Sequence, residues 1–72
     1  MDDFSRELER GIKAVKDGEL IRSLMFFDLA IEMADGSGEG QEWMAWFNKG
    51  LVYVRLGQLE GALECFRVCT EN

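Results

Sequence analysis

Two cysteines are the side chains in this sequence whose type and spacing could support a metal site or redox chemistry. Cys65 and Cys69 stand four residues apart, which places both thiols on nearly the same face of a helix. A disulfide between them is geometrically awkward, and the sequence has no histidine and no third cysteine to complete a tetrahedral zinc site. We interpret the pair as small, semi-buried hydrophobic side chains. An intermolecular disulfide or a metal shared between chains is the alternative.

The carboxylates favour a solvated helical surface over an acid and base pair. Those at solvent-facing or mixed positions of the expected helices are Glu7, Asp28, Glu32, Glu60 and Glu64. No two of them are placed for acid and base roles, and no nucleophile has an activating base beside it. The sequence therefore predicts that the protein is not an enzyme, with no catalytic residue, no cofactor and no metal.

Glycines at positions 36, 38 and 40 superficially resemble a loop that cradles a phosphate. A strand is not expected before them, and Glu39 inside the segment would repel a phosphate group. We interpret residues 36–40 as a glycine-rich link between helices.

The overall composition limits the classes of partner. A net charge of −6 with only eight scattered Lys and Arg residues is wrong for nucleic acid, whose phosphates need clustered cations. The chain opens with Asp2 and Asp3 rather than a basic region, and its apolar runs are too short to span a bilayer, so we expect a cytoplasmic protein without a membrane partner. The hydrophobic fraction of 47% favours a folded chain over a disordered one.

Helices are the elements expected to position these residues. The sequence contains no proline, which would cost about 3 kcal/mol in a helix interior, and apolar residues recur every three or four positions. We predict helices over 4–17, 19–35, 41–56 and 58–71, with Asp2 or Asp3 as the first N-cap.

One stretch carries an informative spacing of aromatic, glycine and small residues. Its members are Trp46, Lys49, Gly50, Tyr53, Gly57, Ala62 and Phe66. This spacing resembles the signature of the tetratricopeptide repeat, W-x2-L-G-x2-Y followed by A-x3-F, with Lys49 in the place of leucine. The resemblance implies one antiparallel pair of helices per repeat and a module that binds a protein or peptide.

A degenerate copy of the motif precedes it by 39 residues. The matching pairs are Gly11 and Gly50, Lys16 and Arg55, Gly18 and Gly57, Leu20 and Leu59, Leu24 and Leu63, Phe27 and Phe66, and Ala30 and Cys69. The family's repeat has about 34 residues, so the excess falls in the link. The sequence predicts one all-α domain over 1–72, with repeat one at about 4–35, the link at 36–40 and repeat two at about 41–72. The resemblance implies that these four helices form a fragment of a right-handed superhelix.

The resemblance implies packing roles for the glycines. Gly11 and Gly50 let the two helices of each repeat approach closely, in the regions of Ser23 and Ala62. Glycines 18 and 57 fall where the first helix of each repeat must end, and a glycine adopts the left-handed conformation there without a Cβ clash.

A buried stripe is expected on the second helix of each repeat, with members Leu24 and Phe27, then Leu63 and Phe66. The full set of packing positions is Gly11, Gly18, Phe27, Ala30, Trp46, Gly50, Tyr53, Gly57, Ala62 and Phe66.

The first helices of such repeats line a concave surface, so the resemblance implies an apolar groove for a partner. Its expected residues are Leu8, Ile12, Val15, Met44, Phe47, Asn48, Leu51, Val54 and Arg55. A carboxylate clamp of the kind found in some family members is not expected, because Leu8 and Ile12 fill the first-repeat positions and only Asn48 matches.

The predicted function is a non-catalytic interaction module or adaptor that holds a peptide or helix in this groove. The alternatives are a structural unit that assembles with itself, and a small chaperone that shields an apolar segment of a partner. Because no polar element follows the second repeat, we expect a homo-oligomer or a fragment of a longer array. A dimer swapped about the link is also conceivable.

Overall fold

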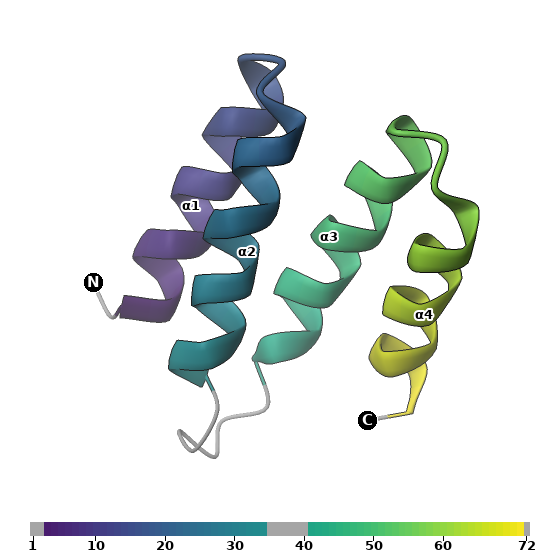
Figure 1. The fold of residues 1–72 in the computed structure, drawn as a ribbon. Coiled ribbons are helices and arrows are strands. Elements are labelled where there is room, and N and C mark those ends of the chain that lie inside the picture. The colour runs from purple at the N-terminus through teal and green to yellow at the C-terminus, as the bar shows by residue number, and fades with distance from the viewer. Residues whose placement is uncertain (1–2, 35–40, 72) are drawn as a thin grey trace.

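The computed structural model describes residues 3–34 and 41–71, and these residues form four α-helices and no strand (Figure 1). Their bounds are α1 Asp3–Lys16, α2 Leu20–Ala34, α3 Glu42–Arg55 and α4 Leu59–Thr70. The all-α prediction is confirmed, and each helix lies within one residue of its predicted ends. Asp3 is the first residue of α1, whereas Asp2 and the glycine-rich link lie outside the described residues.

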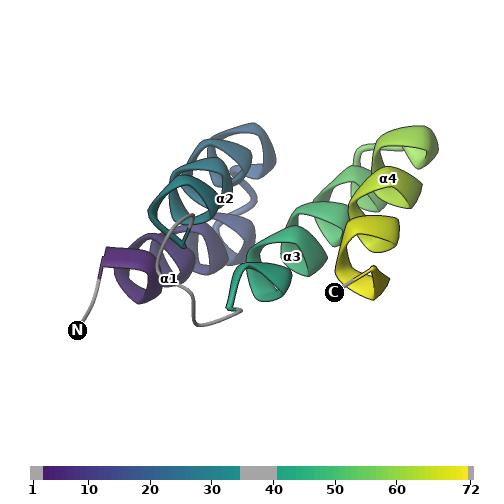
Figure 2. The same cartoon turned by 90° about the horizontal axis from the view of Figure 1, so that it is seen from below.

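The helices form two antiparallel pairs, α1 with α2 and α3 with α4 (Figure 1). Seen along the helix axes, α1 and α3 make one layer and α2 and α4 make the other (Figure 2). Helix α3 packs on both α2 and α1, while α4 packs on α3 alone among the described residues. The connections of both pairs lie at the same end of the molecule (Figure 1), so α1 and α3 run in the same direction.

The two connections have nearly the same backbone. Gly18 and Gly57 have φ angles of 81° and 78°, in the left-handed region that glycine adopts without strain. The Gly18 amide donates to Val15 and the Gly57 amide donates to Val54, both at 3.0 Å. The next amide reaches back five residues in each case, at 2.8 Å, which completes a Schellman motif. The sequence shift of 39 residues therefore corresponds to a repeated structure, and the prediction for both glycines is confirmed.

The close helix approach inside each pair involves a phenylalanine ring. A Cβ atom on Gly11 would lie 2.5 Å from Cε1 of Phe27, and one on Gly50 would lie 2.5 Å from Cε1 of Phe66. The need for glycine is confirmed, but the neighbour is the ring, four residues beyond the expected regions of Ser23 and Ala62. In each pair, the ring from the second helix occupies the space that a side chain at the glycine would need.

Small side chains let the second pair pack on the first. The buried members of this contact are Phe4, Ala30, Ala34 and Ala45, with Leu8, Ile31 and Met44 packed around them. Ala45 of α3 is completely shielded from solvent, so its methyl group sets the distance between α3 and the first pair.

Two expectations about burial are wrong. Glu7 was expected on a solvated face, yet only 4% of it is exposed. It occupies the position equivalent to Trp46, on the side of α1 that is turned toward the rest of the fold. Its carboxylate accepts from Arg10 at 3.2 Å and lies 3.6 Å from Arg6. Leu63 was expected in a buried stripe, yet it is 68% exposed, because among the described residues a further helix packs beside the first pair and none packs beside α4 except α3.

None of the helices in residues 3–34 and 41–71 has the length and apolar character needed to cross a bilayer.

Candidate interaction surface

A cavity of about 400 Å³ opens between α1 and α3. Its lining residues are Ile12, Val15, Lys16, Asn48, Leu51, Val52, Val54 and Arg55. We call this surface the groove. Most of its lining is aliphatic, which suits an apolar side chain of a partner better than a polar metabolite.

The groove exists because two helical stripes face each other. In α1, Val15 and Lys16 follow Ile12 by three and four residues. In α3, Arg55 follows Val52 by three residues and Leu51 by four, so each set shares one helix face. Val52 is 1% exposed and forms the floor, whereas Leu51 and Val54 remain almost half exposed at the rim. The floor is therefore part of the fold, and the rim is open for contact.

Polar groups lie in and at one end of the groove. Asn48 Nδ2 donates to the Met44 carbonyl at 2.8 Å, so the amide nitrogen is bound to its own helix. Lys16 and Arg55 stand in the last turns of α1 and α3, which places two cations at the same end of two helices that run in the same direction (Figure 1). An acidic group on a partner would be favoured at that end.

The structure gathers six of the nine expected groove residues around this cavity, namely Ile12, Val15, Asn48, Leu51, Val54 and Arg55. Leu8 and Met44 instead pack against the buried cluster between the pairs. Phe47 does not line the cavity, and its ring centroid lies 5.9 Å from that of Phe66 in α4. The groove is therefore shorter than the sequence predicted, because Leu8 and Met44, in the N-terminal halves of α1 and α3, pack into the core.

Lys49 has a role that the sequence did not reveal. Its ammonium group lies 2.7 Å from Asp28 Oδ1 and therefore links α3 to α2. It also lies 5.0 Å from the Trp46 ring and 5.9 Å from the Tyr53 ring, within the range of cation–π attraction. Burial lowers the pKa of Lys49, but the hydrogen bond and charge of Asp28, with smaller contributions from Tyr53 and Cys65, outweigh it and raise the pKa above 10.5. The sequence signal for this role was Lys49 itself, which stands where the repeat signature has leucine.

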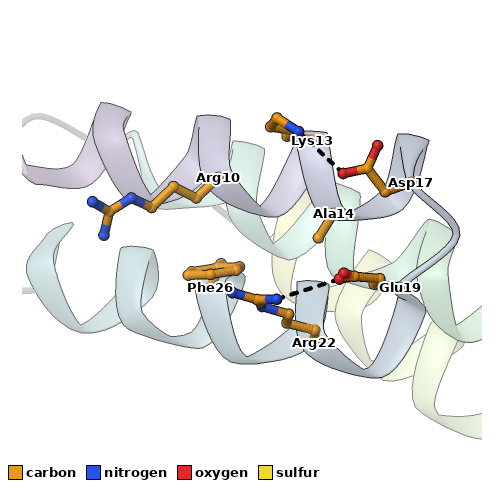
Figure 3. Close-up of a pocket in the computed structure, with 7 residues that line it drawn as sticks. All are labelled: Arg10, Lys13, Ala14, Asp17, Glu19, Arg22 and Phe26. Carbon is orange, nitrogen blue, oxygen red and sulfur yellow. Dashed lines mark hydrogen bonds and ion pairs between the residues drawn. The ribbon is translucent and has the colours of Figure 1, made fainter.

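A second cleft, of about 470 Å³, lies along α1 and α2 (Figure 3). Its lining is mainly charged and comprises Arg10, Lys13, Ala14, Asp17, Glu19, Arg22 and Phe26. Lys13 pairs with Asp17 at 3.1 Å and Arg22 with Glu19 at 3.3 Å, as the dashed lines in Figure 3 show. The Arg22 guanidinium also lies 5.7 Å from the centre of the Phe26 ring. These cations already have partners within the chain, so an anion would have to compete for them.

The cysteines are free thiols in the structure, with Cys65 buried and Cys69 partly exposed. Burial raises the pKa of both thiols above the ordinary value of 9.0, which disfavours the nucleophilic thiolate. The Cys69 thiol donates to the Trp43 carbonyl at 3.3 Å. Within the described residues, no cluster of three or more histidine, cysteine or acidic side chains could hold a metal ion.

No family model, curated protein or solved structure matches this chain.

Proposed function

We propose that this chain is a non-catalytic protein interaction module of the tetratricopeptide type, which holds a peptide or helix of a partner protein in the groove. The observation that carries the proposal is the open aliphatic cavity between α1 and α3, with Val52 as its floor and Leu51 and Val54 at its rim. Apolar anchors that enter such a cavity supply the affinity in helix-in-groove recognition.

The charges at the end of the groove suggest the chemistry of the partner segment. Lys16 and Arg55 favour a carboxylate on the segment, close to its apolar anchors. Such a contact would act locally, since the chain as a whole carries a net charge of −6.

Selection from a random peptide display library tests this function. The wild-type chain should enrich peptides in which two or three apolar residues lie near an acidic residue. A Val15→Glu variant should lose this enrichment because it places a carboxylate in the groove. A Leu63→Glu variant, whose change lies on the outer side of α4, should retain it. A wild-type chain that enriches no shared pattern, or a Val15→Glu variant that enriches the same one, contradicts the proposal.

Self-assembly is the second candidate, favoured by one observation. The outer side of α2 exposes an apolar stripe made of Ile21, Met25, Leu29 and Met33. Exposed apolar surface of this kind marks a contact with another protein surface.

A further inference from the structure

The second helix pair exposes the face that, in the first pair, is covered by α3. In the first pair, α3 packs on the cluster that contains Phe4, Leu8 and Ala30, and its Lys49 reaches Asp28. Leu24 lies one turn before Asp28, on the same face of α2. The equivalent residues 39 positions later are Trp43, Phe47, Leu63, Arg67 and Cys69. We call these five residues the end face. It is distinct from the groove, which lies between α1 and α3.

The end face is more exposed than the equivalent residues of the first pair, although most of its side chains are apolar. Phe4 is 5% exposed, whereas its equivalent Trp43 is 47% exposed. Leu24 is half-buried, whereas Leu63 is 68% exposed. The end face therefore keeps the side chains that receive a helix, although no described helix lies on it.

The contact between α3 and the first pair serves as an internal template for a helix on the end face. Ala45 is its completely buried small residue, against Phe4 and Ala30. Lys49, one helical turn later, reaches Asp28 at 2.7 Å. A helix on the end face would need a small residue at the position of Ala45, because a larger one would hold the helix axes apart.

The charge on the end face is the reverse of that in the template. The residue equivalent to Asp28 is Arg67, so a helix with a cation at the position of Lys49 would be repelled and one with a carboxylate would be attracted. Arg67 at present pairs with Glu64 and Glu71, but all three side chains are more than half exposed, so these pairs exchange at little cost.

A second copy of this chain does not supply such a helix by placing its α1 on the end face in the way that α3 lies on the first pair. Its α1 would place Arg6 at the position of Ala45 and Arg10 at the position of Lys49. Arg6 is too large for a site where the template buries an alanine, and Arg10 would meet Arg67. The cleft in Figure 3 shows the same polar character on the first pair, where Arg10 and Lys13 lie along α1.

We propose that the end face docks an amphipathic helix of a different protein, which carries a small residue over Trp43 and Cys69 and a carboxylate one turn later against Arg67. This surface is independent of the groove and would act beside it.

A synthetic peptide of residues 41–56 with Lys49→Glu is the probe, since it keeps the shape of α3 and reverses its charge. The wild-type chain should bind this peptide about fivefold more tightly than the matched peptide that keeps Lys49. The Arg67→Glu variant should reverse the order. Adding Ala45→Leu to the probe should abolish its binding, because the small contact residue is lost.

Variants of the chain locate the binding. Leu63→Glu should abolish binding, whereas Ile21→Glu, a change of similar exposure on α2, and Val15→Glu, in the groove, should leave it intact. Equal affinity for the two peptides, or no binding of either, overturns the proposal. A wild-type dimer that Leu63→Glu dissociates also overturns it, because a second copy would then cover the end face.

Discussion

A Cβ atom added at Gly11 or at Gly50 would lie equally close to a phenylalanine ring, but the two rings differ in their freedom to move. Phe27 is completely buried, whereas Phe66 is half-buried and rests on the exposed ring of Phe47. The same added methyl group therefore clashes with a fixed ring in the first pair and with a movable ring in the second.

We predict that Gly11→Ala destabilises the fold more than Gly50→Ala does. Overpacking costs about 1–3 kcal/mol, while alanine in place of glycine gains about 1 kcal/mol in a helix. Gly11→Ala should thus cost about 2 kcal/mol and Gly50→Ala about 1 kcal/mol or less. Denaturant unfolding of the two variants measures this difference. Equal losses would mean that Phe27 and Phe66 adapt equally well.

Glu7 offers a second test at the scale of one residue, since its buried carboxylate is paired with exposed arginines. Replacing it with leucine removes a buried charge, and Arg6 and Arg10 remain solvated. We expect Glu7→Leu to be neutral or to stabilise the fold by about 1 kcal/mol. Arg10→Leu is the matched control, because it leaves Glu7 with the weaker contact to Arg6 and should destabilise. A clear loss of stability in Glu7→Leu would show that the ion pairs matter more than the desolvation of the carboxylate.

At the scale of helices, the ion pair between Lys49 and Asp28 joins α3 of the second pair to α2 of the first. Lys49 has a raised pKa, so its stabilising effect is complete below its unfolded pKa of about 10.5 and is lost as the pH rises through its folded pKa. The stability difference between the wild type and Lys49→Met should therefore shrink as the pH rises above about 10.5.

Denaturant unfolding at several alkaline pH values measures this change. Lys13→Met, which removes an exposed lysine from a pair within one helix, controls for the loss of one positive charge. A difference between wild type and Lys49→Met that is constant with pH would show that Asp28 does not raise the pKa of Lys49.

The elements were predictable from the sequence because their signals are local. Gly18 and Gly57 end helices through hydrogen bonds that span five residues, and the stripes of α1 and α3 have the period of a helix. The contact between Lys49 and Asp28 was not predictable, because it depends on how two separate pairs pack. The same holds for Phe47, which belongs to the groove stripe by spacing but turns toward Phe66 in the fold. Glu7 could have been placed correctly, since the shift of 39 residues aligns it with Trp46.

At the scale of the whole molecule, apolar surface is distributed unequally over equivalent positions. Ile21, Met25, Leu29 and Met33 form an exposed stripe on α2. The residues equivalent to Ile21 and Met25 in α4 are Glu60 and Glu64, so the packing of a pair does not require apolar side chains there. The apolar character of the stripe on α2 is therefore not explained by packing within the pair.

We predict that this stripe mediates self-association, with α2 of one copy against α2 of another across a two-fold axis. A modest apolar contact of this kind should populate dimers at tens of micromolar, roughly the range of weak symmetric interfaces. Met25→Glu should yield a monomer with unchanged helicity, because 64% of Met25 is exposed and its side chain adds little to the core. Leu63→Glu is the matched control on α4 and should remain dimeric. Sedimentation velocity over a range of concentrations distinguishes these outcomes, and a wild-type chain that stays monomeric throughout contradicts self-association through the α2 stripe.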